Sequence, residues 1–535
     1  MENLMTMPPV AHATVAETSA TTTAVEGTNG ELRERNGNGN GIFKPNLEEP
    51  QLLKPQVTGG SSDEALSSGT ATPLPEDAPP SAVSISVARR VRRRLFPTIA
   101  YESRVSHFDP ASQHHDFRGF FSLFWVGLVI MLITTVLRNL KENGSIMRTN
   151  IFSLFAHGPF ELGIADLAMV ASTGFVLPLQ QMYAKGGIKM GDKVIRWDKE
   201  GHWIQHALQA VWLAIWVYLP FFFNWQWTRQ VFFTLHALTL LMKIHSYSFY
   251  SGHLSECHQK LKSLDLLTPE KETTEQSELR ETLAFELTSP DGRVTYPNNL
   301  TRENFVDYML CPTLCYELSY PRVPTIRIEK LLEKSSAVFG CVFLLTVVSE
   351  EYILPVMQDA HIQLAASTGY YESFLILLES ISLLLFPYMI TFLLVFLVIF
   401  EYVLGFFAEL TRFGDRHFYS DWWNCSDWLE FSRMWNVPVH RFLQRHVYSI
   451  SRPRHGRPVA YLVTFLISAL AHELVMFCLT KKLRGYGFVC QMLQLPIVAI
   501  QRIPLVKAQR RLNNVLFWVS MIWGLSMISS LYVLL

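Results

Sequence analysis

The sequence predicts an all-α membrane protein that crosses the bilayer about nine times. Hydrophobic residues make up 49% of its 535 residues and charged residues only 17%, whereas a typical globular domain contains about 25% charged residues. Apolar windows long enough to span a bilayer recur along the chain. Their approximate limits are 117–137, 162–183, 203–223, 230–250, 335–354, 377–407, 459–479, 486–501 and 515–535.

Residues 1–88 differ from these windows in composition. They are rich in Thr, Ser, Gly, Asn, Pro and Glu and poor in aromatic residues, so they cannot bury enough apolar surface to offset the entropy of ordering. We expect a disordered cytosolic tail followed by one transmembrane domain, 89–535. The basic run 89–94 is typical of the cytosolic flank of a span, and nucleic-acid binding is the less favoured interpretation. A net charge of zero likewise gives no field that would attract nucleic acid.

The Lys and Arg residues between the windows predict their orientation, because such residues favour the cytosolic side. The connection after the second window is basic, and so is 412–457, whereas 355–373 contains no Lys or Arg. With a cytosolic N-terminus, the connection after the second window and the connection 412–457 lie in the cytosol, and 355–373 lies on the far side. Three basic residues disagree with this scheme: Lys481, Lys482 and Arg484.

Three stretches depart from a plain series of spans. Window 377–407 is long, and Pro387 offers a kink. Window 486–501 is short and contains Gln491, Gln494 and Pro496, so we expect it to be buried among the other helices. The longest connection, 251–334, is assigned to the cytosol, and its mixed-charge part 269–282 is expected to be solvated and disordered.

The apolar window 459–479 carries Ser468, His472 and Glu473. Ionisable residues at membrane depth are costly and usually functional; the alternative is a histidine that is only hydrogen-bonded within a helix bundle. Burial would favour the neutral imidazole that a general base needs. Ser468 lies one helical turn before His472 on the same face, whereas Glu473 projects about 100° away and is expected to bond a neighbouring helix.

Two polar, aromatic-rich motifs precede this window: FYSDWWN at 418–424 and WNVPVH at 435–440. Trp and Tyr rings suit a membrane interface, and packing of an amphipathic segment is the structural alternative for each residue. The seven cysteines show neither a metal-binding spacing nor a disulfide framework. We therefore expect no metal site.

FYSDWWN, WNVPVH and SALAHEL (468–474), in this order, resemble the signature motifs of the membrane-bound O-acyltransferases, in particular the sterol and diacylglycerol acyltransferase branch. The resemblance extends from about residue 89 to the C-terminus. It implies the fold of that family, acyl-CoA as a substrate, and no cofactor. The sequence HEL at 472–474 and the segments 242–250 and 311–322 are similar to the sterol branch, although 242–250 also reads as an interfacial aromatic belt with a lysine anchor.

The resemblance also implies roles for individual residues. His472 would be the general base and Asn436 a donor to the developing oxyanion. Supporting positions would be Trp435, His440, Ser468, Glu473 and Gln494. The acyl-CoA-binding positions would be Phe418, Tyr419, Asp421, Trp422, Trp423, Asn424, Tyr448 and Arg457. Arg457 would meet phosphate, although its place on a basic flank explains it equally well.

The activity implied is acyl-CoA:sterol O-acylation by direct attack of a sterol 3β-hydroxyl, since the chain has no Gly-x-Ser-x-Gly nucleophile elbow. Diacylglycerol acylation is the alternative within the same chemistry. A transporter or proton channel would also place His and Glu in a membrane helix, but no pair of interrupted helices supports it. The resemblance further implies an endoplasmic reticulum membrane protein that forms dimers or tetramers.

Overall fold

The computed structural model describes residues 94–109, 112, 118–147, 158–266 and 273–535. The chain divides into two units, Met1–Gln56 and Val57–Leu535, and every described residue belongs to the second. The predicted tail 1–88 and the residues 269–272 of the mixed-charge run lie outside the described residues.

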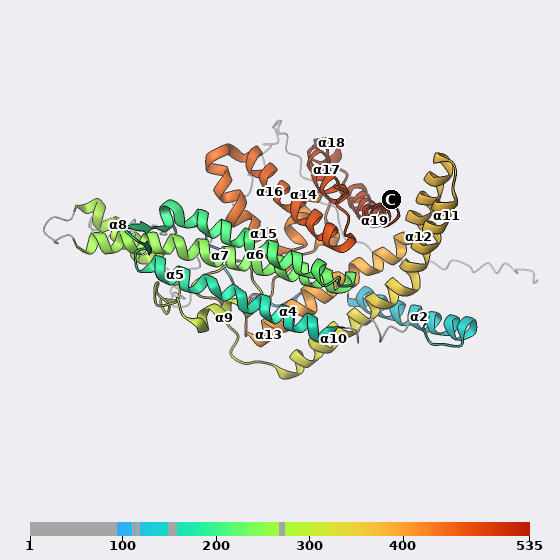
Figure 1. The fold of residues 1–535 in the computed structure, drawn as a ribbon, viewed down its shortest axis with the longest axis horizontal. Helices are drawn as coiled ribbons and strands as arrows, with labels where there is room; N and C mark the ends of the chain where they lie inside the picture. Colours follow the sequence, from blue (N-terminus) through green and yellow to red (C-terminus); the bar gives the residue numbers. More distant parts are fainter. Residues whose placement is uncertain (1–93, 110–111, 113–117, 148–157, 267–272) are drawn as a thin grey trace, which may run out of the picture. The chain divides into compact units, whose positions relative to one another are not determined.

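Nearly all of the regular secondary structure in the described residues is helix (Figure 1), which confirms the predicted fold class. The α-helices are α2 (Arg118–Asn143), α4 (Pro159–Ser172), α5 (Val176–Ala184), α6 (His202–Phe222), α7 (Trp227–Asp265), α8 (Thr274–Glu286), α9 (Arg302–Leu310), α10 (Ile328–Val348), α11 (Leu354–Ala366), α12 (Tyr370–Phe396), α13 (Leu404–Leu410), α14 (Trp428–Met434), α15 (Val437–Leu443), α16 (Ser449–Thr480), α17 (Tyr486–Gln501), α18 (Pro504–Lys507) and α19 (Arg510–Leu534). Short 3₁₀ or π turns are η1 (Thr173–Phe175), η2 (Trp197–Gly201), η4 (Ser349–Ile353), η5 (Leu397–Val403), η6 (Trp422–Asn424) and η7 (Gln444–Tyr448). A small antiparallel hairpin pairs β1 (Ile188–Met190) with β2 (Lys193–Ile195), with Ile188 opposite Ile195.

Seven helical segments of the described chain are long and apolar enough to cross a membrane. They are Gly119–Asn143, Pro159–Ala184, Trp197–Phe222, Ile328–Ala366, Tyr370–Leu410, Val437–Thr480 and Arg510–Leu534. Helix α17 is apolar but shorter, as expected for 486–501. The predicted window 230–250 lies inside the longer helix α7, which is not among the seven. The protein is therefore a multi-pass membrane protein.

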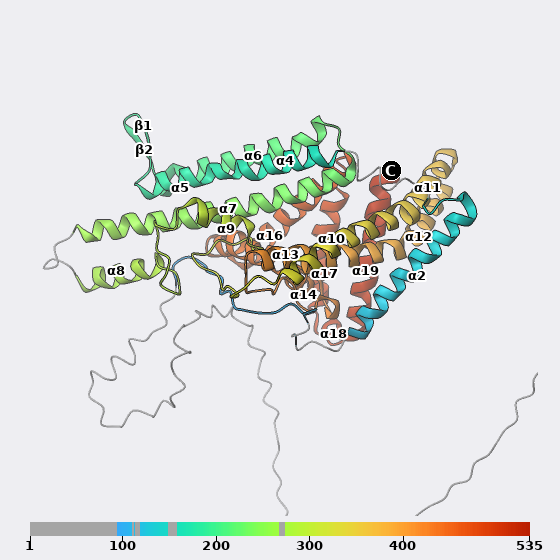
Figure 2. The same cartoon turned by 90° about the horizontal axis from the view of Figure 1, so that it is seen from below.

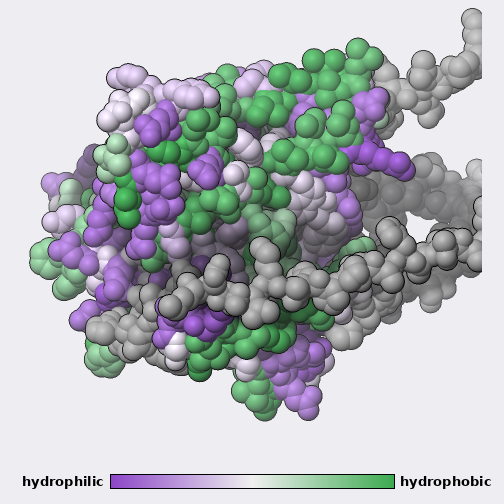
Figure 3. Space-filling model, turned by 90° about the vertical axis from the view of Figure 1, so that its right-hand side faces the viewer, coloured by the Kyte–Doolittle hydropathy of each residue, from purple (hydrophilic) through white to green (hydrophobic). Residues whose placement is uncertain are grey.

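The spans expose apolar side chains where a soluble protein would bury them. On α2, Phe120 is 74% exposed and Leu123 is 63% exposed, and Figure 3 shows hydrophobic patches over one face of the molecule. Large exposed apolar surfaces mark contact with lipid or a partner. The inner side of α2 is different, because Leu128 is buried against Cys341 of α10 and Ile390 of α12.

The connection 251–334 contains more helix than the sequence predicted. Helix α7 continues to Asp265, and α8 packs against it (Figures 1 and 2). A capping box starts α8: Thr273 Oγ1 accepts a hydrogen bond from the Gln276 N–H, and Gln276 Oε1 accepts one from the Thr273 N–H. The expectation of disorder was therefore wrong for residues 274–282, which a strong helix start and the buried Leu283 hold in place.

The connection 355–373 was also predicted as a loop, and most of it is helix α11. Only residues 367–369 separate α11 from α12, so the two helices form a hairpin. Helix α12 continues through Pro387, and the irregular turn occurs further on, in the π-helical η5.

The segments 242–250 and 311–322 meet in the protein core. Lys243 Nζ donates to the carbonyl oxygens of Tyr308, Cys311 and Thr313, at 2.9, 2.7 and 2.8 Å. These carbonyls belong to a helix end and a stretch without regular secondary structure, so they need side-chain partners. Tyr247 is also fully buried. The interpretation of 242–250 as an interfacial belt was therefore wrong.

Candidate active site

Helix α16 carries the predicted catalytic histidine after a sharp break. At Gly456 the backbone has φ 80° and ψ 175°, a conformation that glycine adopts without a steric penalty. Pro453 and Pro458 lie on either side of this break. The uninterrupted helix that follows corresponds to the predicted window 459–479, and it presents Ser468 and His472 one turn apart.

A hydrogen bond within α16 fixes the orientation of the His472 ring. Nδ1 lies 2.8 Å from the carbonyl oxygen of Ser468. Since a carbonyl oxygen can only accept, this contact requires a proton on Nδ1, so the lone pair of the neutral ring is on Nε2. When the His472 ring is neutral, it is therefore the tautomer whose Nε2 can accept a proton.

Two glutamines of α17 extend this polar group. Gln491 Nε2 donates to Ser468 Oγ at 3.4 Å, and Gln494 Nε2 donates to Gln491 Oε1 at 3.2 Å. The structure thus links Gln494 through Gln491 to Ser468, one turn before His472. Gln491 was not predicted as a site residue. Its signal was present in the sequence, because two glutamines three residues apart share one face of a helix.

His472 is exposed on the protein surface, so the expectation that the protein buries it was wrong. The apolar side chains of Leu466 and Leu470 on the same helix are also exposed, at 37% and 55%. Other helices leave much of this part of α16 uncovered. An apolar molecule, such as lipid, is the natural neighbour of such a surface.

Glu473 binds the start of α17 rather than the His472 ring. Its Oε1 accepts from the Gly485 N–H at 2.8 Å, and its Oε2 accepts from the Phe488 N–H at 3.0 Å and from the Tyr532 hydroxyl at 2.6 Å. A carboxylate is favourable there because the first N–H groups of a helix lack partners. The predicted bond of Glu473 to a neighbouring helix is confirmed. Glu473 thereby fixes the helix that carries both glutamines.

The FYSDWWN segment (418–424) is divided into a buried and an accessible part. Phe418, Tyr419 and Trp422 are 4%, 1% and 1% exposed and pack in an aromatic core. The side chain of Asp421 is 40% exposed, and Asn424 is exposed as well. A bound molecule can therefore touch only part of this segment, and the three buried residues act through packing.

The two aromatic motifs are joined by backbone hydrogen bonds. The Val437 N–H donates to the Phe418 carbonyl at 3.0 Å, and the Ser420 N–H donates to the Met434 carbonyl at 2.8 Å. The Trp435 ring lies 4.8 Å from the Trp422 ring. The predicted Trp435 and the FYSDWWN segment thus form one structural unit.

Asn436 caps helix α15. Its Oδ1 accepts from the Val439 N–H at 3.1 Å, which leaves the two Nδ2 protons as donors. His440 follows one helical turn later, since its N–H donates to the Asn436 carbonyl at 2.9 Å. Among the described residues, neither Asn436 nor His440 hydrogen-bonds to His472. The two predicted catalytic residues, Asn436 and His472, therefore belong to separate hydrogen-bonded clusters in this structure.

The remaining predicted positions lie further along the chain. Tyr448 packs against Tyr461 with ring centroids 5.1 Å apart, and Arg457 is exposed beside the Gly456 break.

Sequence reasoning missed the buried Arg445, whose Nη1 lies 3.0 Å from Glu317 Oε1. Burial raises the pKa of Glu317, and the Arg445 guanidinium opposes this shift.

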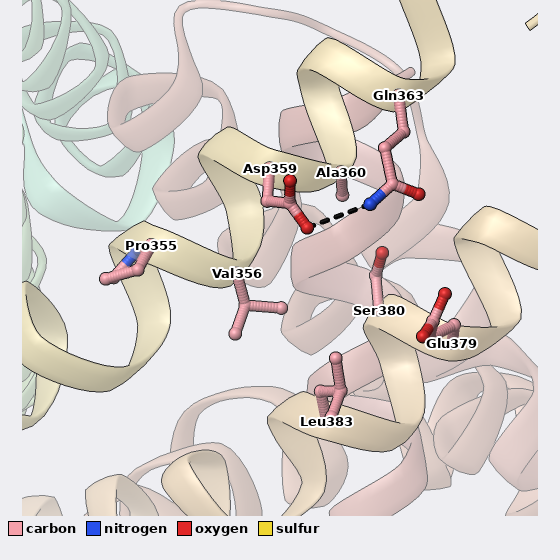
Figure 4. A pocket seen from close by; sticks show the side chains of 8 residues that line it. All are labelled: Pro355, Val356, Asp359, Ala360, Gln363, Glu379, Ser380 and Leu383. Carbon is pink, nitrogen blue, oxygen red and sulfur yellow. Dashed lines mark hydrogen bonds between the residues drawn. The ribbon is translucent and has the colours of Figure 1, made fainter. Parts of the chain in front are cut away.

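A cavity of about 300 Å³ lies between α11 and α12 (Figure 4). Its lining includes Asp359, Gln363, Glu379 and Ser380, and none of the predicted site residues. A second cavity of about 120 Å³ is lined by Phe418 and Glu401 among others. Within the described ranges no group of three or more His, Cys, Asp or Glu side chains is arranged to hold a metal ion.

Comparisons with known proteins agree with the family resemblance. The sequence profile of the membrane-bound O-acyltransferase family matches residues 208–534. "Probable sterol O-acyltransferase 2" of Schizosaccharomyces pombe is 39% identical over 424 residues, which cover 78% of this chain and 87% of that protein. "Sterol O-acyltransferase 2" of Candida albicans is 31% identical over 489 residues, or 82% of this chain and 78% of that protein. "Diacylglycerol O-acyltransferase 1" of Dictyostelium discoideum is 33% identical over 271 residues, or 50% and 43%. This chain belongs to the membrane-bound O-acyltransferase family.

Proposed function

We propose that this protein is an acyl-CoA:sterol O-acyltransferase that forms steryl esters. The observation that carries the chemistry is the His472 ring, held by the Ser468 carbonyl with Nε2 left as a base. The apolar, incompletely covered surface of α16 suits an alcohol that arrives from the bilayer. The long matches to two fungal sterol O-acyltransferases favour a sterol as that alcohol.

In the proposed reaction the sterol 3β-oxygen attacks the thioester carbonyl carbon as its proton moves to His472 Nε2. The tetrahedral intermediate collapses with cleavage of the carbon–sulfur bond, and the imidazolium returns the proton to the coenzyme A thiolate. The products are a steryl ester and free coenzyme A, with no acyl-enzyme intermediate. Asn436 Nδ2 would donate to the oxyanion. This role requires that Asn436 and His472 come close together when the substrates bind.

The proposed route for acyl-CoA uses the accessible part of the FYSDWWN segment, Asp421, Trp423 and Asn424. We place the N-terminus and this segment in the cytosol and the protein in the endoplasmic reticulum membrane. The sequons at Asn299 and Asn424 would then escape glycosylation, and the buried Asn299 already binds the Tyr316 hydroxyl at 2.9 Å. A glycan on Asn424, seen as an endoglycosidase-sensitive gel shift absent from Asn424→Gln, would contradict this orientation. A homodimer or homotetramer is part of the same proposal.

Diacylglycerol is the alternative acceptor, since the Dictyostelium relative carries that name. The test supplies purified protein with radiolabelled oleoyl-CoA and one alcohol at a time: a 3β-hydroxysterol, its 3α epimer, or diacylglycerol. We expect labelled steryl ester from the 3β-sterol and little from the epimer, whose oxygen cannot reach Nε2 in the same pose. Equal rates on the two epimers, or faster labelling of diacylglycerol, would contradict sterol as the substrate.

A further inference from the structure

Residues 94–109, which we call the strap, precede α2 in the sequence and form no helix or strand (blue in Figure 2). Four carboxylates from four separate segments of the chain accept hydrogen bonds from the strap. These carboxylates are Glu286, Glu317, Glu401 and Asp415, and they are 0%, 8%, 6% and 2% exposed. Buried carboxylates need hydrogen-bond partners, and here the strap supplies many of them.

The first part of the strap is fixed mainly through its backbone. The N–H groups of Leu95 and Phe96 donate to the Glu286 carboxylate at 3.1 and 3.2 Å, and the Ile99 N–H donates to Glu317 at 2.9 Å. Arg104 then donates from Nε and Nη2 to the two oxygens of Asp415, at 3.0 and 2.7 Å. These contacts bring the following residues to the FYSDWWN segment.

Ser106 reaches the buried core of that segment. Its hydroxyl donates to Glu401 Oε2, which also accepts from the Tyr419 hydroxyl at 3.1 Å. Lys334 Nζ lies 2.9 Å from the other oxygen of Glu401. Glu401 therefore joins the strap to the part of the FYSDWWN segment that is buried.

His107 contacts the accessible part. Its Nε2 lies 3.1 Å from Asp421 Oδ1, and its ring stacks on Tyr419 with centroids 5.2 Å apart and an interplanar angle of 30°. The edge of Trp423 packs on the same ring, at 6.2 Å and 83°. His107 itself is only 9% exposed. One imidazole thus fixes the carboxylate and two aromatic rings of the motif.

We propose that His107 is a positioning residue for acyl-CoA, one that holds Asp421 and Trp423 in place and donates a hydrogen bond to the Asp421 carboxylate. This inference rests on the proposed function, which assigns the FYSDWWN segment to acyl-CoA. Coenzyme A carries several phosphate charges, and a carboxylate whose side chain is 40% exposed would repel them if it lost its partner. Like charges a few ångströms apart repel strongly unless another group compensates.

The test separates the donor of His107 from its ring. His107→Gln keeps an N–H donor, His107→Phe keeps the stacked ring, and His107→Ala removes both. Arg104→Gln is the control, because it weakens the strap at Asp415 and does not touch the FYSDWWN segment. For each purified variant, KM for oleoyl-CoA, KM for the sterol and kcat are measured at low and high salt, together with thermal unfolding in detergent.

We expect His107→Ala and His107→Phe to raise the KM for oleoyl-CoA about tenfold at low salt, since a hydrogen bond to a charged group is lost. High salt should reduce this increase, because salt screens the repulsion. The KM for sterol and kcat should stay within about twofold of wild type in these two variants. His107→Gln, which keeps an N–H donor, and Arg104→Gln, which does not touch the FYSDWWN segment, should resemble wild type. The expected tenfold increase in KM corresponds to about 1.4 kcal/mol.

An unchanged KM for oleoyl-CoA in His107→Phe would overturn the proposal. So would a loss of kcat in every variant that tracks a loss of thermal stability, because that pattern shows a structural role only. If His107→Ala does not fold, the phenylalanine and glutamine variants, which keep the side-chain volume, still decide between donor and ring. A wild-type protein that forms no steryl ester from oleoyl-CoA contradicts the proposed function itself, and this result is read separately from the variants.

Discussion

The part of α16 that carries His472 and the FYSDWWN segment differ in how firmly the rest of the chain holds them. His472 is exposed, and its ring makes one hydrogen bond, from Nδ1–H to the Ser468 carbonyl of its own helix. Trp422 is 1% exposed and lies within 5.5 Å, centroid to centroid, of the rings of Phe392, Phe396, Trp435 and Trp518. The first region is open on an apolar surface, and the second is part of the core.

This difference separates the consequences of mutation in the two regions. A side chain that packs against little can be changed with small effects on the free energy of unfolding, so its loss is seen in the reaction. A side chain inside a dense aromatic core affects stability first, and activity follows as folded protein is lost. The comparison therefore predicts which measurement should respond to each variant.

The largest effect on the reaction is expected for His472→Ala. Loss of a general base typically lowers the rate by about 10²–10⁴-fold, while the midpoint of thermal unfolding should not change. His455→Ala is a matched control, because His455 is an exposed histidine of α16 that lies before the Gly456 break. Steryl ester formation and unfolding in detergent are measured on both variants. Near-normal turnover by His472→Ala would refute the assignment of the base.

Asn436 tests whether the second region also takes part in the reaction. If Nδ2 is the oxyanion donor, Asn436→Asp should lower kcat by about 10²–10³-fold, although aspartate remains a good helix cap. Asn436→Ser also keeps a cap and provides a hydroxyl donor, so it should retain more activity. A rise in KM for acyl-CoA with an unchanged kcat would instead assign Asn436 to substrate binding.

Much of the membrane architecture was readable from the sequence, because span length and apolar composition are local properties. Within the site, the sequence predicted the features that depend on helix geometry alone. These are the i, i+4 relation of Ser468 and His472 and the direction in which Glu473 projects. The partners of Glu401 were not, since Ser106, Lys334 and Tyr419 lie far apart in the sequence. Glu401 was itself a signal, because it is a carboxylate within the apolar window 377–407.

The exposure of His472 could not be foreseen for a related reason. An apolar window shows that a residue lies at membrane depth, and it does not show whether protein, lipid or substrate covers that residue. The structure of 242–250 and 311–322 was hidden in the same way. In the sequence, Lys243 is typical of an anchor at the membrane interface. In the structure it is a buried donor, because a segment almost 70 residues further along the chain packs against it and presents the Cys311 carbonyl.

A pair of variants in the FYSDWWN segment, at Trp422 and Asn424, tests the next effect, on stability rather than chemistry. Trp422→Ala should lower the free energy of unfolding by about 3–5 kcal/mol, as for other large core truncations. Asn424→Ala, two residues away and exposed, should change it by less than about 0.5 kcal/mol. Thermal unfolding in detergent compares the two variants with wild type. Equal midpoints for both would show that the aromatic core does not hold this segment.

The smallest effect is expected for Glu473→Gln, which tests the link between the open helix and its neighbour. The glutamine oxygen can still accept one hydrogen bond from the start of α17, but the charge that favours a helix N-terminus is lost, at a cost of about 0.3–2 kcal/mol. Because α17 carries Gln491 and Gln494, we expect kcat to fall several-fold while the KM for acyl-CoA stays unchanged. Glu473→Ala should fall further, since Gly485 and Phe488 then lose their acceptor. Unfolding midpoints and kcat are measured together, and a loss of kcat as large as that of His472→Ala at an unchanged midpoint would mean that Glu473 acts in the chemistry directly.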